Sequence, residues 1–194
     1  LSKKSRPMNL DATFLLPPEE ELRLMIEEWV SEDVGIQDLT TNIMIPVSAK
    51  ADFVMNTRED IVISGIEVAA EVFRHMVPDA KVRVLVKDGL HAKKRTSLMR
   101  VTGPARGLLT AERTALNILQ FMSGIATMVN EYAALIAHTS SQLIDTRKTI
   151  PGMRMLSKYS ACIGGCRPHR LGLHDGVLIK DNHIAVHGSI TKAI

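Results

Sequence analysis

The spacing of apolar residues changes along the chain in an order that constrains the fold more than any other feature. Apolar residues recur at helical spacing over residues 18–35 and again over residues 66–76, which predicts two amphipathic helices. Apolar and polar residues alternate over residues 51–56 and 81–87, which predicts two strands. This order of elements indicates a small α+β domain, which we place at residues 1–107.

Beyond Pro104 the pattern changes to helices that alternate with short apolar runs. Such an alternation is typical of parallel α/β units, so residues 108–194 are expected to form a second region of that type. Its expected elements are a long helix with a break near Ser123 and Gly124, a buried strand, a helix and a second buried strand, at residues 108–137, 142–146, 153–161 and 176–180.

Each of the two strands expected in this region ends directly in charged residues. Arg147 and Lys148 follow the first strand, Lys180 follows the second, and His169 and Arg170 lie on the loop between them. Ligands of parallel α/β folds bind at the carboxyl ends of strands, so we expect these cations to converge on one cleft. Because converging cations repel one another, the expected ligand carries carboxylate or phosphate groups.

Each of these residues also has a simpler interpretation. A single arginine or lysine after a strand is usually a solvated surface charge, and a single histidine is more often packed than catalytic. Ligand binding is favoured by the density of cations, because Asp175 is the one acid among the seven lysines and arginines of residues 147–180. This density predicts an anion site but does not identify a reaction.

Composition and charge argue against several classes of protein. The net charge of +3 is mild and aromatic residues make up 4% of the chain, which disfavours a nucleic-acid-binding module. Apolar runs stay well short of the roughly 18 residues of a membrane helix, and the basic N-terminus leads into no signal-peptide-like apolar stretch. We therefore expect a cytoplasmic protein without nucleic-acid or membrane partners.

The cysteines, Cys162 and Cys166, lie close together in the sequence. A secreted disulfide scaffold would need more cysteines at wider spacings. A metal site would need further ligands, for which His169 and His174 are weak candidates. We expect the two cysteines to be buried or free thiols.

A series of longer motifs resembles the quinolinate phosphoribosyltransferase family. The resemblance covers nearly the whole chain, follows the family's order and spacing, and is most specific over residues 103–188. Several long ordered motifs together are a far stronger signal than any one of them. The motifs are EDVG at 32–35, DLTT at 38–41, ERTALN at 112–117, SGIAT at 123–127, DTRKTIPG at 145–152, KY at 158–159, GG at 164–165, HRLGL at 169–173 and LIKDNHI at 178–184.

This resemblance implies both a fold and an activity. Family members have an N-terminal open-faced α+β sandwich domain followed by an α/β barrel, of which residues 108–194 would form the first units. They are pentosyltransferases that transfer phosphoribose from phosphoribosyl pyrophosphate to quinolinate. The products are nicotinate mononucleotide for NAD biosynthesis, pyrophosphate and carbon dioxide. The resemblance also implies Mg²⁺ as cofactor and a homodimer, or higher homo-oligomer, with shared active sites.

The resemblance assigns roles residue by residue. Arg113 matches an arginine that family members extend into the partner subunit's site to bind quinolinate. Lys148 and Lys180 match lysines of the family that contact both the substrate and the phosphoribosyl donor. They are therefore the expected catalytic residues. Further quinolinate-binding residues are matched by Arg147, His169 and Arg170.

The central loop and the end of the chain depart from the family pattern. Cys166 stands where the family has a glycine, and Pro168 replaces an asparagine with loss of a backbone N–H. Family members continue past Ile194 with acidic residues that hold magnesium and ribose, so the Mg²⁺ ligands are expected there. The chain alone is expected to bind quinolinate without turning it over. The acids expected to orient lysines and arginines rather than a metal are Asp145, Asp175 and Asp181.

Several alternatives remain open. The chain is either part of a longer protein or a truncated, catalytically inactive homologue that binds pyridine carboxylates or assembles with a full-length partner. A homologue from a molybdenum locus, with the same fold and a substrate that the sequence leaves open, is a further alternative. A generic basic nucleic-acid module is the remaining alternative, and the low aromatic content argues against it.

Overall fold

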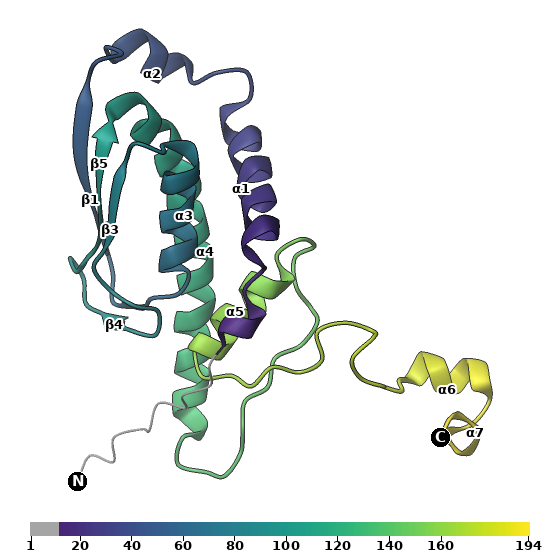
Figure 1. The fold of residues 1–194 in the computed structure, drawn as a ribbon. Coiled ribbons are helices and arrows are strands. Elements are labelled where there is room, and N and C mark those ends of the chain that lie inside the picture. The colour runs from purple at the N-terminus through teal and green to yellow at the C-terminus, as the bar shows by residue number, and fades with distance from the viewer. Residues whose placement is uncertain (1–11) are drawn as a thin grey trace.

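The computed structural model describes residues 12–194. Within this range, short strands, the 3-10 helix η1 and three α-helices come before the longest helix, α4, and only helices and loops follow it (Figure 1). In chain order the elements are η1 (Thr13–Leu15), α1 (Glu19–Val34), α2 (Leu39–Met44), β1 (Lys50–Asn56), β2 (Ile61–Val62), α3 (Ile66–Met76), β3 (Lys81–Val84), β4 (His91–Ala92), β5 (Ser97–Pro104), α4 (Ala105–Ile136), α5 (Arg154–Ile163), α6 (Asp181–His187) and α7 (Ile190–Ala193).

A three-stranded antiparallel sheet, in the order β1-β5-β3, forms the N-terminal domain together with α3 and the first part of α4. Phe53 of β1 and Val82 of β3 both pair with Val101 of the central strand β5. One face of the sheet packs against α3 and α4 (Figure 1), whereas Lys50 and Asp52 on the other face are exposed. The N-terminal open-faced α+β sandwich domain is therefore confirmed.

The central strand β5 was missing from the elements expected on the apolar spacing. Leu98 and Met99 are adjacent in the sequence and both are buried, so β5 lacks the strict alternation that marks a half-exposed strand. The pairing of β1 with β5 shifts register between Met55 and Asn56, opposite this end of β5. A register irregularity of this kind turns successive side chains toward the same side and hides the strand from periodicity.

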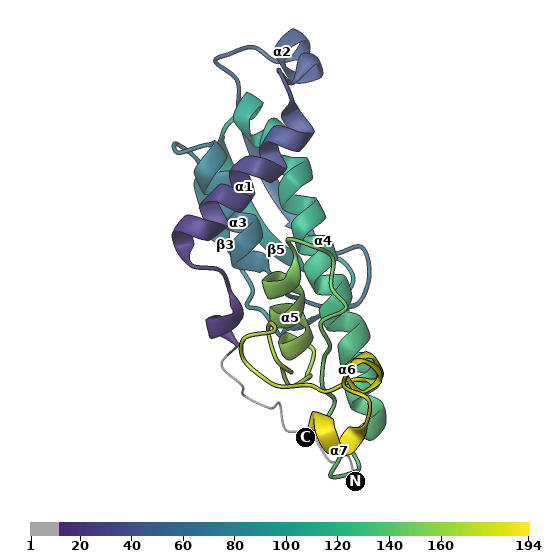
Figure 2. The same cartoon turned by 90° about the vertical axis from the view of Figure 1, so that its right-hand side faces the viewer.

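Both amphipathic helices of the N-terminal domain form where the spacing predicts them. α1 begins after Pro18 with three glutamates in its first turn, where the helix dipole favours negative charge, and ends at Gly35 with φ of 56°. α3 spans Ile66–Met76 and buries its apolar face in the domain core. Figure 2 shows α1 lying across the side of the domain that α3 and α4 form.

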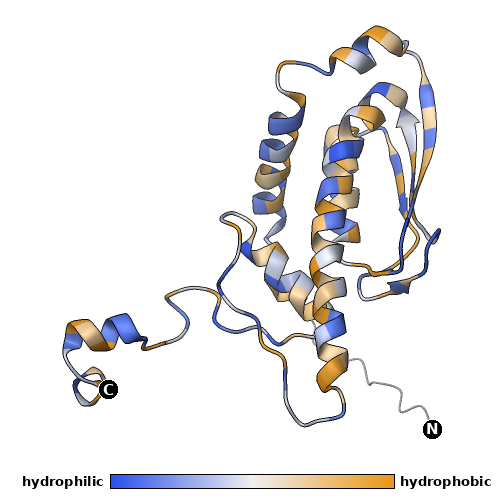
Figure 3. Ribbon diagram, turned by 180° about the vertical axis from the view of Figure 1, so that it is seen from behind, coloured by the Kyte–Doolittle hydropathy of each residue, from blue (hydrophilic) through white to orange (hydrophobic). Residues whose placement is uncertain are grey.

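The long helix α4 runs without interruption from Ala105 to Ile136, so the expected break near Ser123 and Gly124 is wrong. Ser123 is buried and its hydroxyl accepts a hydrogen bond from the Ser64 amide at 3.1 Å. Tertiary packing of this kind outweighs the low helix propensity of serine and glycine. Figure 3 shows hydrophobic and hydrophilic residues alternating around α1 and α4, as expected for helices with one buried face.

A second hydrophobic cluster lies beyond the N-terminal domain, where α5 packs on α4 and η1. Leu15 of η1, Met122 of α4 and Leu156 of α5 are fully buried in it. The helix expected at residues 153–161 is confirmed as α5. Because α4 contributes to both clusters, it connects the N-terminal domain to the segment that carries the expected site.

The two strands expected after α4 are wrong for the described residues. Residues 142–146 form one parallel bridge, between Ile144 and Arg167, and residues 176–180 form no strand, with Val177 94% exposed. A strand forms only where a neighbouring strand pairs with its backbone groups, and no described segment supplies such a partner for the exposed residues 176–180.

The helices α6 and α7 contact each other and no other helix or strand of residues 12–194, and Figures 1 and 2 show them apart from the rest of the chain. Within the same residues, every helix is too short or too polar to span a membrane. The region that begins with α4 and α5 therefore supplies the first helices of the barrel part and not a closed sheet.

Candidate active site

Two loop segments, residues 145–149 and 167–171, lie side by side next to α5. The Arg167 amide donates to the Leu143 carbonyl at 2.8 Å, and the Asp145 amide donates to the Arg167 carbonyl at 3.2 Å. These two bonds give the parallel bridge between Ile144 and Arg167. The residues that follow on each segment are thereby brought to the same edge of the molecule.

A buried ion pair between Lys158 and Asp145 holds the two segments together. The Lys158 side chain is 1% exposed, and its Nζ donates to Asp145 Oδ1 at 2.6 Å and to the His169 carbonyl at 3.0 Å. Asp145 Oδ1 also accepts from the His169 amide at 2.7 Å. Asp145 thus orients a lysine, as the sequence predicted.

One helical turn earlier, Arg154 makes a second link between the same two segments. Its Nε donates to Thr149 Oγ1 at 3.3 Å and its Nη1 donates to the Leu171 carbonyl at 3.3 Å. α5 therefore contacts both segments twice. Lys158 binds Asp145 and the His169 carbonyl, and Arg154 binds Thr149 and the Leu171 carbonyl.

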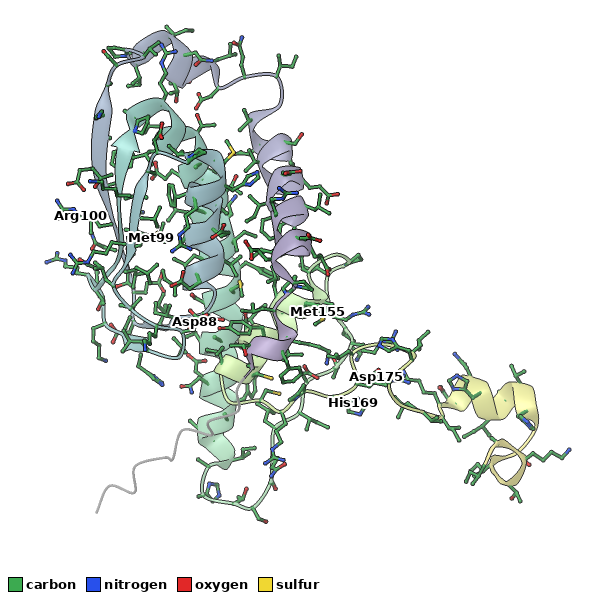
Figure 4. All side chains as sticks on the ribbon, in the orientation of Figure 1. Asp88, Met99, Arg100, Met155, His169 and Asp175 are labelled. Atoms are coloured by element: carbon green, nitrogen blue, oxygen red, sulfur yellow. The ribbon has the colours of Figure 1, made fainter. Side chains whose placement is uncertain are left out.

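The loop that follows Arg170 closes on itself. Asp175 accepts from the Leu171 amide at 2.6 Å and from the Gly172 amide at 2.9 Å, and these backbone N–H groups lower the pKa of its carboxyl. The expectation that Asp175 orients a lysine or arginine is wrong, because both of its carboxylate oxygens accept from backbone amides of the same tight loop. Figure 4 shows Asp175 and His169 on the side of α5 away from Asp88.

The structure places four of the predicted site residues on the two adjoining segments. Lys148 and His169 are exposed, and His169 Nδ1 accepts from the Arg170 amide at 2.7 Å. Arg170 Nη1 donates to the Gly176 carbonyl at 2.8 Å. Arg147 is partly buried, and its Nε has no hydrogen-bond partner among the described residues. These four therefore share one edge, and their roles in binding stay predictions.

Lys180 is not brought to this edge. It precedes α6, where its backbone amide donates to His183 Nδ1 at 2.9 Å, and its side chain is exposed. Since α6 and α7 contact no other helix or strand in the described part of the chain, the single cleft expected from the sequence does not include Lys180 here. Its assignment as a catalytic residue stays a prediction.

Arg113 lies on a different part of the surface, in the first half of α4. It is exposed and lines a hollow of about 360 Å³ with Asp38 and Thr110, next to α2. It also lines a larger hollow of about 800 Å³ beside β1. Neither hollow is lined by Arg147 or His169, and the role of Arg113 toward a partner subunit stays a prediction.

Residues 12–194 offer no site that fits a magnesium ion. No group of three or more histidine, cysteine, aspartate or glutamate side chains in this range is placed to hold a metal. Asp145 Oδ2 is buried without a hydrogen-bond partner, but its other oxygen binds the Lys158 ammonium, which would repel a cation. We therefore assign no step of the reaction to a metal held by these residues.

The two cysteines are free and buried, as expected. Burial raises the pKa of Cys162 to about 11, and the negative charge of Asp145 adds to the shift. Burial likewise raises the pKa of Cys166 to about 11. Both thiols are therefore neutral and packed, and neither is a nucleophile or a metal ligand in this arrangement.

The sequence did not reveal the roles of Lys158, Arg154 and Tyr159. Lys158 was counted among the cations available to a ligand, but it is buried and neutralised by Asp145. The available signal was its position on α5, between the apolar residues Leu156 and Tyr159 of the buried face. A lysine so placed is kept in the interior only when an anion pairs with it.

Two family models match the chain. One describes the N-terminal domain of quinolinate phosphoribosyl transferase and matches residues 38–123, and the other describes the C-terminal domain and matches residues 125–194. Among curated proteins, a probable nicotinate-nucleotide pyrophosphorylase [carboxylating] of Synechocystis is 40% identical over 180 residues, 92% of this chain. A chloroplastic nicotinate-nucleotide pyrophosphorylase of rice is 42% identical over 178 residues, 91% of this chain.

A mitochondrial quinolinate phosphoribosyltransferase [decarboxylating] of tobacco is 38% identical over all 194 residues. The chain spans 60%, 47% and 55% of the lengths of the Synechocystis, rice and tobacco proteins. Solved structures agree in fold. A nicotinate-nucleotide pyrophosphorylase of Francisella tularensis superposes with a TM-score of 0.86 at 35% identity, over 92% of this chain and 63% of that one. NadC of Streptococcus pyogenes gives 0.87 at 33% identity, with the same coverages.

Proposed function

The chain belongs to the quinolinate phosphoribosyltransferase family, and we propose that its protein transfers phosphoribose from phosphoribosyl pyrophosphate to quinolinate, with decarboxylation to nicotinate mononucleotide. The observation that carries this proposal is the joining of residues 145–149 to residues 167–171 by the buried pair of Lys158 and Asp145. This joining sets Arg147, Lys148 and Arg170 on one edge beside His169, where a small dianion with two carboxylates would offset most of their positive charge.

The cations on this edge suit the charges that the reaction presents. Quinolinate carries two carboxylates, and loss of one of them develops negative charge on the ring. Cations fixed in place before the reaction stabilise such charge without reorganising. Arg147 is the strongest candidate for a direct contact, because its buried Nε lacks an acceptor and a ligand carboxylate would supply one. His169, Arg170 and Lys148 lie on the same two joined segments.

Arg113 is proposed to act across a subunit interface. Its place on α4, apart from the edge that carries Arg147, supports a role toward a second copy of the chain. The homodimer itself is a proposal. In mixed dimers, an Arg113→Ala chain and a Lys148→Ala chain, each inactive alone, are expected to recover part of the activity. Verified mixed dimers that stay inactive would argue against a shared site.

The magnesium requirement and the cytoplasmic location are also proposals. Since residues 12–194 contain no group that fits a metal, the magnesium would be held by other residues of the protein. The rice relative is a chloroplastic enzyme and the tobacco relative a mitochondrial one, so fractionation of the source cells is the direct test of location.

The activity is tested by pyrophosphate release from the whole protein with quinolinate, phosphoribosyl pyrophosphate and Mg²⁺. Arg147→Ala is expected to lower kcat/KM for quinolinate by about ten- to a hundredfold, as for loss of one charge-assisted contact. Arg83→Ala is the matched control, because Arg83 is an exposed arginine on the sheet. Equal activity of the two variants, or no quinolinate-dependent release by the unmutated protein, would overturn the proposal.

A further inference from the structure

Three consecutive residues of α5 fix this helix in three directions. Lys158 Nζ reaches the two site segments, the Tyr159 hydroxyl donates to Asp88 Oδ2 at 2.7 Å, and Ser160 Oγ lies 3.1 Å from Ser64 Oγ. Successive residues of a helix point about 100° apart, so the three contacts spread around the axis. The three residues are buried, and a rotation of α5 would break all of these bonds.

One face of α5 carries two cations, Arg154 and Lys158, which together with their bonds to the two site segments are called the ladder. Arg154 and Lys158 are four residues apart and therefore lie above one another on the helix. Each donates to both site segments: Lys158 to Asp145 and the His169 carbonyl, and Arg154 to Thr149 and the Leu171 carbonyl. The four acceptors flank Arg147 and Lys148 on one segment and Arg170 on the other.

We propose that Lys158 and Arg154 are positioning residues of the quinolinate site. The inference rests on the proposed function and adds to it an account of what aligns the binding cations. Lys158 does not meet the substrate, because its side chain is 1% exposed and its charge is neutralised by Asp145. Its part is to hold residues 145–149 against residues 167–171, so that cations from both segments face one ligand.

This proposal predicts that affinity for quinolinate depends on the ladder and not on overall stability. Lys158→Met breaks the ladder and leaves the Asp145 carboxylate buried without a counter-charge, so both stability and affinity should fall. The double variant Lys158→Met/Asp145→Leu removes the buried charge as well, and apolar replacements of buried ion pairs are often neutral or stabilising. Its Tm should therefore recover while its affinity stays low.

The experiment measures quinolinate binding by calorimetry on the whole protein, at a temperature where circular dichroism shows each variant folded. We expect about a tenfold or greater loss of affinity in the double variant and about a threefold loss in Arg154→Met, whose bonds are longer and go to neutral acceptors. Lys93→Met is the control, because Lys93 also makes a 2.7 Å ion pair, with Asp60, but on the far surface of the N-terminal domain. Its affinity should not change.

Hydrogen exchange of the Arg167 amide, which donates to the Leu143 carbonyl, reports the joining of the segments without any ligand. It should accelerate in the double variant and not in Lys93→Met. Full affinity together with unchanged exchange in the double variant would overturn the inference and leave the proposed function standing. If the unmutated protein binds no quinolinate, the proposed function and the site that the ladder would serve both fail. The exchange result then shows only whether the ladder holds the segments.

Discussion

The carboxylate of Asp88 ties three parts of the molecule together. It accepts from the Gly65 and Ile66 amides at 2.8 and 3.0 Å, at the start of α3, and from the Tyr159 hydroxyl at 2.7 Å. Figure 4 shows Asp88 at the end of α3 nearest α5. Amides in the first turn of a helix have no partner within the helix, so a carboxylate there both satisfies them and favours the dipole.

Tyr159→Phe removes one of these donors and keeps the ring in the second cluster. We expect the free energy of unfolding to fall by about 1.5 kcal/mol, at the lower end of the range for one hydrogen bond to a charged group. Asp88→Ala should cost about 2–3 kcal/mol, because it leaves two helix amides and the hydroxyl without their acceptor. Urea denaturation measures both, with the exposed Tyr132→Phe as control. Equal stability of all three variants would contradict the role of Asp88.

The raised pKa values of the cysteines give a second prediction at this scale. A thiol with a pKa of about 11 has roughly one part in a thousand as thiolate at pH 8, against one in ten at the ordinary value of 9.0. Native Cys162 and Cys166 should therefore react with a disulfide reagent at least about a hundredfold more slowly than the same thiols in urea. Single Cys→Ala variants assign the rates, and a fast native thiol would contradict the burial.

Residue identity predicted part of the site. The cations directly after the first apolar run and on the loop that follows drew attention to residues 145–149 and 167–171, which the structure joins, whereas Lys180 after the second apolar run lies apart from them. The buried pair of Lys158 and Asp145 escaped prediction because pairing depends on which side chains meet in space, and a charge count treats every lysine alike. For the same reason Asp175 was expected to orient a lysine or arginine, although its two oxygens accept from backbone amides.

At the scale of elements, the crossing of α4 and α5 depends on a glycine. A Cβ at Gly164, just after α5, would lie 2.5 Å from the Ala126 carbonyl oxygen and 2.8 Å from Val129 Cβ. Backbone cannot withdraw as a flexible side chain does, so Gly164→Ala should cost about 1–3 kcal/mol. Gly124 lies within α4 with nothing within 4 Å of its Cβ position, and Gly124→Ala should add up to about 1 kcal/mol.

Thermal melts of the two alanine variants measure this difference directly. The Tm of the two variants should shift in opposite directions. The same substitution causes a clash at Gly164 and a gain in helix propensity at Gly124. A stabilised Gly164→Ala would show that α5 is not packed closely on α4. A destabilised Gly124→Ala would show that this part of α4 meets a partner that the chain alone does not display.

Elements with a clear apolar period of their own were predictable and the others were not. α1 and α3 follow from one amphipathic face and clear end signals, and β1 and β3 follow from alternation. β5 is central and irregular, so its apolar residues lose the alternation. Residues 142–146 and 176–180 have strand-like composition, but a strand also needs a neighbour, and composition does not report whether one is there.

At the scale of the whole molecule, α4 contributes buried side chains to both hydrophobic clusters. Its first half packs with α3 and the sheet, and its second half packs with η1 and α5. Ser64, Ser123 and Ser160 form a buried set of hydrogen bonds between the clusters. A shared helix and satisfied polar contacts transmit unfolding of one cluster to the other, so residues 12–163 are expected to unfold as one unit.

Trp29 makes this expectation measurable, because it packs against both clusters and is the one tryptophan of the sequence. Its fluorescence and the far-ultraviolet circular dichroism should give coincident urea transitions. Leu108→Ala in the first cluster and Leu156→Ala in the second, both fully buried positions, should each lower the stability by about 3–5 kcal/mol. Either variant should shift the whole transition for both probes. If Leu156→Ala instead splits the curve and leaves the later step at its original midpoint, the second cluster unfolds alone, and α5 would be held to the N-terminal domain too weakly to position the site segments.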